Sequence, residues 1–541
     1  MYVKEASPIL PSKNIVTTLS ASAPTYVSDS DSDLDTMYSP ISELEPMLAS
    51  PSGGKPPRSH PLDASKSLRP EPSTAKCNDA FFAVVFLTNV VILSIIAFWK
   101  GIPSLKEDTE SHDGPVAAGH TMAWTLIALL CILATVLSLA WIKLLMTFAA
   151  SMIRVALWLN VGMILGFAVT TLSVNVWAAL MFLALGAVNV CYIYAVQNRI
   201  AFASANLKAA CAGLKHSSGV FALAFVLVLH QLAWIGLWGL ACLGMHRIFV
   251  EADPACDREL ELASRGRSPG GLCVGLPAYA ALFYMLVSVY WGQQVLQNIL
   301  TCTTAGVIAT WWYQPHAQKA TVGALYRSLT TSFGSICFGS LIVAVLQALK
   351  TMADAAKRRA SEENSSGLAC LACMAECILS CLATIMEYVN QWAYVYVGVY
   401  GYPFRTSGKA VMDLFKTRGW TAVINDDLTS SALSFGALGI GVVTCCVGLL
   451  MVRMAPMDWF SEWGSRASVY GTMAVVGFMV GMSMALILAH VIIAALHTIF
   501  VCFAEDPVAF NRNHQREYED LVAGYRQFHG DVLFAAFGGS V

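Results

Sequence analysis

The chain has 541 residues, of which 56% are hydrophobic and only 13% are charged, and its formal net charge is −2. Soluble domains carry about 25% charged residues, so this composition excludes an ordinary soluble globular protein. The nearly neutral charge, without a long run of lysine and arginine, gives no support for nucleic acid as a partner.

The first 78 residues form a polar segment that is rich in serine and proline. Such a composition cannot bury enough apolar surface to offset the entropy of ordering, so we expect residues 1–78 to be a disordered tail. The segment starts at Met1 without a charged and then apolar leader. We therefore expect the first membrane helix to stay in the protein and to act as its signal.

Ten apolar blocks follow, and each is long enough to cross a bilayer as a helix. A hydrocarbon core about 30 Å thick needs about 20 helical residues, and a helix satisfies its own backbone groups in lipid. The sequence therefore predicts an all-α, polytopic membrane protein with about ten transmembrane helices. The blocks are 80–99, 122–146, 152–172, 175–196, 219–243, 278–312, 329–349, 367–400, 431–453 and 470–503. Blocks 278–312, 367–400 and 470–503 exceed one membrane thickness, so each is one long tilted helix, a helix with an interfacial extension, or two short pieces.

Lysine and arginine in the short connections predict the orientation. Basic residues before the first block and in the loop 197–218 place both on the cytoplasmic side. An even number of helices then returns the C-terminus to the cytoplasm. The loop 350–366 is basic although alternation places it outside, so either this loop is an exception or a neighbouring block is misread. The expected domains are a cytoplasmic tail (1–78), a transmembrane domain (79–504) and a second cytoplasmic tail (505–541).

Two groups of cysteines differ from isolated packing residues. Cys256 and Cys273 lie in the polar loop 246–277, which alternation places outside. In an oxidising compartment the two thiols either form a disulfide or remain free, and the sequence leaves both alternatives open. A second group lies on one face of a helix, which favours packing or acylation near the membrane surface over metal binding. Its members are Cys370, Cys373, Cys377 and Cys381. We expect neither a metal nor a cofactor, and no motif predicts an enzyme.

Polar residues inside the apolar blocks are the best indication of function, because burying them in lipid is costly. Trp291, Gln294 and Asn298 share one helical face, where amides can bind a hydroxyl and an indole face attracts a cation. Block 367–400 adds a carboxylate, an amide and a tyrosine from an aromatic run. The predicted substrate-binding residues are Trp291, Gln294, Asn298, Glu387, Asn390 and Tyr394, with plain packing as the alternative.

Three further residues are candidates for proton coupling. Glu376 shares a helical face with Glu387, and a carboxylate within the membrane can hold a proton. His490 and His497 lie two turns apart on one face, and histidine titrates near neutrality. The alternatives are a hydrated Glu376 at the membrane surface and hydrogen-bonded structural histidines.

Six stretches occur in an order and spacing that agree with one known family over residues 80–510. They are Arg199–Lys208, Trp291–Tyr313, Ser332–Leu341, Asn390–Tyr394 leading to Tyr400-Gly401, Ile424–Asp426 and Thr498–Asp506. Together they resemble the choline transporter-like solute carrier family, including its fungal pH-nine-sensitive branch. The short first outside loop favours a fungal-like or protist-like member. His497 stands where the family pattern leads us to expect an aspartate.

The resemblance implies a ten-helix carrier with both termini in the cytoplasm, choline or ethanolamine as substrate, and proton antiport as the coupling. We expect residence in the plasma membrane, with endosomal or vacuolar membrane as alternatives, and contact with membrane lipid. The leading hypothesis is transport of choline or a related small organic cation. The rival hypotheses are a non-transporting membrane scaffold or stress-response protein of the same family, and a membrane enzyme that acts on lipid.

Overall fold

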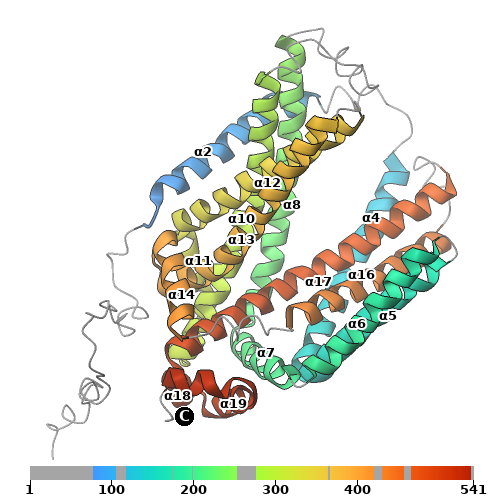
Figure 1. Ribbon diagram of the computed structural model, residues 1–541. Helices are drawn as coiled ribbons and strands as arrows, with labels where there is room; N and C mark the ends of the chain where they lie inside the picture. The colour runs from blue at the N-terminus through green and yellow to red at the C-terminus, as the bar shows by residue number, and fades with distance from the viewer. Residues whose placement is uncertain are drawn as a thin grey trace, which may run out of the picture. The chain divides into compact units, whose positions relative to one another are not determined.

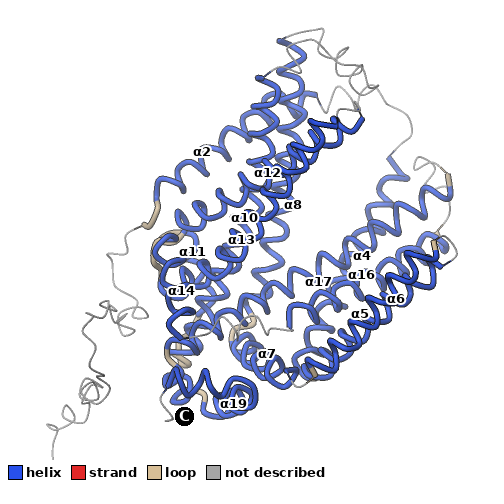
Figure 2. Tube along the Cα trace, viewed as in Figure 1, coloured by secondary structure: helices blue, strands red, loops and turns tan. Residues whose placement is uncertain are grey.

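The computed structural model describes residues 77–104, 117–172, 175–197, 199–252, 276–362, 366–418, 429–455 and 465–537. All of them belong to the second of two units, Asp63–Val541, and the first unit, Met1–Leu62, lies outside the described residues. The predicted disulfide between Cys256 and Cys273 also lies outside them. The described part of the chain consists of helices and short turns and contains no strand (Figure 2).

Each of the ten predicted blocks corresponds to one long helix (Figure 1). In chain order they are α2 (Ala80–Ile96) with its π-helical continuation η3 (Ala97–Gly101), α4 (Ala117–Thr147), α5 (Ala149–Leu172), α6 (Val176–Val196), α8 (Gly219–Ala252), α10 (Leu276–Tyr313), α12 (Phe333–Glu362), α13 (Ser366–Tyr400), α16 (Thr429–Met454) and α17 (Arg466–Glu505). The three longest blocks are therefore single continuous helices.

Nine helices in the described ranges are long and apolar enough to cross a membrane, which makes the chain a multi-pass integral membrane protein. The tenth long helix, α10, is not among the nine, because amide and hydroxyl side chains lower its apolar character. α10 is nevertheless central. It packs against α8, α12, α13 and α17, and against the shorter helices α7 (Arg199–His216), α11 (Ala320–Leu329) and α18 (Pro507–Asn513).

Shorter helices lie where the sequence predicts loops or a tail. They are α7 (Arg199–His216), α11 (Ala320–Leu329), α14 (Phe404–Arg418), α18 (Pro507–Asn513) and α19 (Gln515–Phe537). The interpretation of 197–218 as a loop was wrong. α7 is a largely buried helix that packs against α17 and α19, and its alanine, serine and glycine residues permit this close packing. Most of the supposed loop 350–366 is likewise helical, because α12 continues to Glu362.

The core is concentrated in the C-terminal halves of three helices. Nearly every residue of α10 from Asn298 to Trp312, of α13 from Asn390 to Tyr400, and of α17 from Leu488 to Ala504 is buried. The first halves of α13 and α17 keep many side chains exposed. In Figure 1 the ribbons of α13 and α17 converge toward α18 and diverge toward their first residues. These helices are therefore tightly packed at one end only.

Glycines bring α17 against α16. A Cβ atom on Gly481 would lie 1.9 Å from Oγ1 of Thr444, and one on Gly477 would lie 2.9 Å from the Thr444 carbonyl oxygen. The Thr444 hydroxyl donates to the Gly477 carbonyl oxygen at 2.8 Å. Small residues at such positions let membrane helices approach closely. The second pair with this spacing, Gly162 and Gly166, has no atom within 4 Å of a Cβ at either position, so this pair is not a packing site among the described residues.

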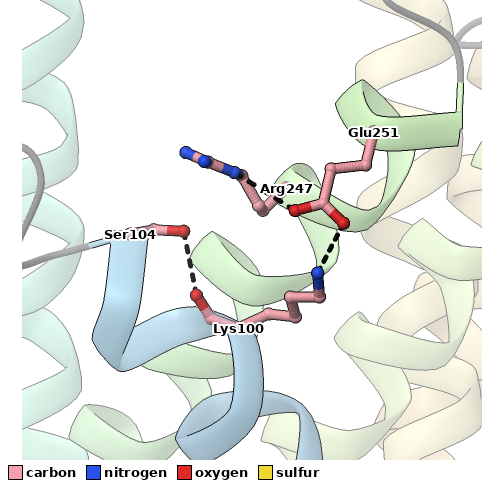
Figure 3. A network of polar contacts seen from close by, with 4 residues as sticks. All are labelled: Lys100, Ser104, Arg247 and Glu251. Carbon is pink, nitrogen blue, oxygen red and sulfur yellow. Dashed lines mark hydrogen bonds and ion pairs between the residues drawn. The ribbon is translucent and has the colours of Figure 1, made fainter.

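A polar network joins η3 to the end of α8 (Figure 3). Nζ of Lys100 lies 2.5 Å from Oε2 of Glu251, and Nε of Arg247 lies 3.4 Å from Oε1 of the same carboxylate. The hydrogen bond from Lys100 lowers the pKa of the Glu251 carboxyl. The backbones also meet here, since a Cβ atom on Gly101 would lie 2.1 Å from the Leu240 carbonyl oxygen. The end of the first membrane helix is thereby held against α8.

We expect Gly481→Val to destabilise the fold, because the added side chain overlaps Thr444 on α16. Overpacking of this kind costs about 1–3 kcal/mol, which should appear as a lower midpoint temperature of the detergent-solubilised protein. Gly162→Val is the matched control. It changes the helix propensity by the same amount, but no atom lies within 4 Å of a Cβ at this position. Equal midpoints for the two variants would contradict the close α16–α17 contact.

Candidate functional site

A polar cavity of about 350 Å³ lies among α10, α12, α13 and α17. Most of its lining residues carry an amide, a hydroxyl, an imidazole or a carboxylate. They are Gln294, Gln297, Asn298 and Thr301 of α10, Val343 of α12, Glu387, Asn390, Gln391 and Tyr394 of α13, and His490, Ile493, Ala494 and His497 of α17. The cavity lies where the packed halves of the helices begin.

α12 holds the polar residues of α13 in place. Nε2 of Gln347 donates to Oε1 of Glu387 at 3.0 Å, and Nδ2 of Asn390 donates to the Gly339 carbonyl oxygen at 3.1 Å. Asn390 is buried, and its Oδ1 has no hydrogen-bond partner among the described residues. Buried acceptors are normally paired, so the Oδ1 of this lining residue is an unsatisfied acceptor in the described structure and a candidate partner for a ligand hydroxyl.

Ser340 of α12 joins two residues of the cavity lining, Asn298 and Tyr394, by hydrogen bonds. Nδ2 of Asn298 donates to Oγ of Ser340 at 3.0 Å, and the same Oγ lies 3.1 Å from the Tyr394 hydroxyl. The Tyr394 hydroxyl also donates to the Ile336 carbonyl oxygen at 3.2 Å. Three helices, α10, α12 and α13, are thus cross-linked by side chains that the sequence alone places on separate segments.

The two histidines line the α17 side of the cavity. Nε2 of His490 lies 2.9 Å from Oγ1 of Thr301, and its Nδ1 accepts from Nε2 of Gln297 at 3.5 Å. The His497 ring packs against the Trp392 indole, with ring centroids 4.2 Å apart. Together with Glu387, these imidazoles bring three titratable groups to one cavity.

Two of the predicted residues lie elsewhere. Trp291 is buried outside the cavity lining, where its Nε1 donates to the Cys337 carbonyl oxygen at 3.0 Å and its ring meets Phe86. Glu376 forms an ion pair with Lys357 at 2.8 Å, apart from the cavity. The structure therefore gives Trp291 a packing environment and places Glu376 nearer the start of α13.

The packed end beyond the cavity contains a carboxylate that the sequence-based choice of sites omitted. Glu505, the last residue of α17, accepts hydrogen bonds from the hydroxyls of Tyr396 and Tyr400 of α13. The sequence feature that could have indicated this contact is the spacing of Tyr396 and Tyr400, which lie four residues apart on one face of α13. Gln297, Thr301 and Gln391 of the cavity lining were also omitted, although each follows a predicted residue by one helical turn or less. 

α18 and the start of α19 cover this packed end. Nε1 of Trp312 donates to the Asp506 carbonyl oxygen at 3.1 Å, and Nδ2 of Asn513 donates to the Trp312 carbonyl oxygen at 2.9 Å. The rings of Trp312 and Phe510 are stacked, with their centroids 4.0 Å apart.

On the side of the cavity away from this packed end, the side chains of Gln297 and Glu387 are exposed. The cavity is closed at one end and open at the other.

A multi-pass helical bundle with a polar central cavity is the architecture of a membrane carrier for small solutes. A family described as plasma-membrane choline transporter matches residues 180–508, which is more than half of the chain and includes every residue of the cavity lining. The chain belongs to this family. Membership assigns it a transporter-type role and confirms the predicted resemblance.

The relatives of this chain include fungal proteins and one protein of Dictyostelium discoideum. The chain is 27% identical to Protein PNS1 of Mycosarcoma maydis over 469 residues, which are 85% of each protein. It is 29% identical to Protein PNS1 of Gibberella zeae over 406 residues, 74% of this chain and 73% of the relative. It is 24% identical to a CTL-like protein of Dictyostelium discoideum over 490 residues, 87% of this chain and 80% of the relative.

We expect Glu505→Ala to destabilise the packed end, because two tyrosine hydroxyls lose their acceptor. Hydrogen bonds to a charged group contribute about 1.5–3 kcal/mol each, so the midpoint temperature of the solubilised protein should fall clearly. Glu519→Ala, at an exposed position on α19, serves as the control and should leave the midpoint unchanged. A Glu505→Ala variant as stable as the control would show that the link contributes nothing.

Proposed function

We propose that this protein carries choline, or a related small organic cation such as ethanolamine, across the plasma membrane through the cavity. The observation that supports this most directly is the pairing of an exposed carboxylate, Glu387, with an unpartnered buried acceptor, Oδ1 of Asn390. The two residues are one helical turn apart on the same wall. A substrate with a positive head and a nearby hydroxyl matches both groups.

The charges of the lining favour a cation. Among the residues that the structure describes, Glu387 is the one carboxylate of the cavity lining, and none of them adds a lysine or arginine to it. Electrostatic attraction between unit charges is stronger near a protein of low dielectric constant than in bulk water. An anionic substrate would meet a like charge without a counter-charge, so the lining selects against it.

The amides supply the recognition of a hydroxyl. Nδ2 of Asn390 donates to the Gly339 carbonyl oxygen, which fixes the orientation of the side chain, and its Oδ1 has no hydrogen-bond partner among the described residues. A hydroxyl donor would satisfy this oxygen, and the penalty of leaving it unpaired would disappear. Choline and ethanolamine both carry such a hydroxyl, which is why we propose them as one substrate class.

Proton exchange is the coupling that we infer. Glu387 binds either a proton or a cation, so a proton that arrives from one side displaces the cation toward the other. His490 and His497 line the same cavity, where a proton on either imidazole would add positive charge that opposes the cation.

The rival interpretation is a membrane scaffold or stress-response protein that has lost transport. Such a protein has no need for a polar cavity that is open at one end. The matching family is one of transporters, so we propose a carrier in preference to an enzyme.

We expect labelled choline to enter choline-transport-deficient cells that express this protein, with saturable kinetics and a response to an imposed pH gradient. Glu387→Gln should reduce uptake by about tenfold or more, because the counter-charge of the cation is lost. The dependence of the remaining uptake on the imposed pH gradient should also decrease in this variant. Glu519→Gln, which removes an exposed carboxylate of α19, is the matched control.

Surface expression of each variant is measured in parallel. Correctly localised protein that moves neither choline nor ethanolamine in either direction would refute the substrate assignment and favour the scaffold. Saturable uptake that Glu387→Gln leaves unchanged would instead place the cation elsewhere in the molecule.

Asn390→Leu should weaken the preference for choline over tetramethylammonium, which has the same head but no hydroxyl. A neutral hydrogen bond contributes about 0.5–1.5 kcal/mol, equivalent to roughly a twofold to tenfold change in the affinity ratio. Competition of the two compounds against labelled choline measures this ratio. The ratio is independent of expression level, so an unchanged ratio would contradict hydroxyl recognition by Asn390 even if the variant is less stable.

A further inference from the structure

Before its buried last part, α13 has two faces of opposite polarity, an exposed apolar face and a polar face that is partly exposed. One face is apolar and consists of Leu371 (64% exposed), Met374 (56%), Ile378 (58%), Leu382 (45%) and Ile385 (53%). The other face is polar, and steps of three or four residues place its members on one line along the helix. They are Glu376, Ser380, Thr384, Glu387 and Gln391.

A groove of about 430 Å³ follows the polar face. Its lining comes from α13 and from Lys357 of α12: Lys357, Cys373, Glu376, Cys377, Ser380, Cys381 and Thr384. Thr384 is three residues before Glu387, which lines the central cavity. The groove therefore leads along α13 to within one turn of the cavity.

The two faces need different surroundings. α13 includes the membrane-length span Cys370–Tyr400, and its apolar face suits lipid. Polar and charged side chains are costly in hydrocarbon, so the opposite face needs protein or water. The Lys357–Glu376 ion pair at 2.8 Å satisfies part of it, but Thr384 and Glu387 remain exposed in the described structure. Water is the surrounding that fits an exposed polar face.

We propose that this groove is the water-filled access path to the central cavity, and that Glu376 and Glu387 are two successive carboxylates along it. Lys357 moderates the charge at the first of them, so that a cation passes Glu376 without being held there. The identity of that cation as substrate rests on the proposed function. The presence of water in the groove does not.

The thiols of the groove make the path testable in the unmodified full-length protein. A thiol in water ionises and reacts with a charged methanethiosulfonate, whereas a thiol in lipid does neither. Cys377 lines the groove. Cys446 of α16 is also exposed, but it shares the apolar surface of Val442 (50% exposed), Val443 (47%) and Leu450 (55%), so it is a natural lipid-facing control.

The protein is labelled in intact and in permeabilised cells with trimethylammonium-ethyl methanethiosulfonate, and the modified cysteines are quantified by peptide mass spectrometry. We expect Cys377 to react at least about tenfold faster than Cys446 in one or both preparations. The anionic sulfonatoethyl reagent should react more slowly with Cys377, because Glu376 and Glu387 repel it. Equal rates for Cys377 and Cys446 would overturn the proposal, whether lipid or another protein covers the groove.

A matched pair of variants tests the same point on one helix. In a chain with Cys373, Cys377 and Cys381 changed to serine, Thr384→Cys places a thiol in the groove, and Leu382→Cys places one on the apolar face at nearly the same depth. We expect rapid labelling of the first variant and slow labelling of the second. Similar rates would again overturn the access path.

Labelling does not depend on transport, so the two proposals fail in different ways. Selective labelling of the groove without choline uptake supports the path and removes the substrate. Saturable choline uptake with no selective labelling removes the path and leaves the carrier. If both proposals hold, the attached trimethylammonium group at Thr384→Cys should block uptake, while modification of Leu382→Cys should not.

Discussion

The interior of this protein is organised by the requirement that every polar group in a membrane has a partner in protein or in water. In the packed halves of α10, α13 and α17 the partner is protein. Asn298, Ser340 and Tyr394 satisfy one another across three helices, and Thr301 lies within hydrogen-bond distance of His490. Where the helices separate, Glu387, Gln297 and Thr384 are exposed, and the cavity and groove lie there.

This division makes the molecule asymmetric along the helices. One end is sealed by aromatic packing, by the α18 contacts with Trp312, and by Glu505, which joins α17 to two tyrosines of α13. The other end exposes Glu387 and Gln297. A carrier with a fixed central site exposes that site to one side at a time. The described arrangement corresponds to one such state, and transport requires the sealed end to open.

The cavity combines residues with different kinds of support. Asn390 and Tyr394 are buried and anchored to backbone carbonyl oxygens of α12, so their positions are rigid. Glu387 is exposed and contacts the half-buried amide of Gln347, which leaves the carboxylate freer to respond to a charge. Rigid hydrogen-bonding groups with a more mobile counter-charge suit a site that binds a cation and then releases it.

Local sequence patterns were enough to identify the class of the protein, the ten long helices, and the polar residues that share a face on each helix. Hydropathy and helical periodicity are local, so Gln294 with Asn298, Glu387 with Asn390, and His490 with His497 were identifiable from spacing alone. The packing of the helices was needed to show that these three pairs line one cavity, that the Trp291 indole donates to the Cys337 carbonyl oxygen, and that Glu376 pairs with Lys357. It also decided that α7 is a buried helix and that Glu505 meets two tyrosines. The physical reason is that periodicity specifies the face of one helix, whereas the helix that packs on that face is set by contacts between segments far apart in the chain.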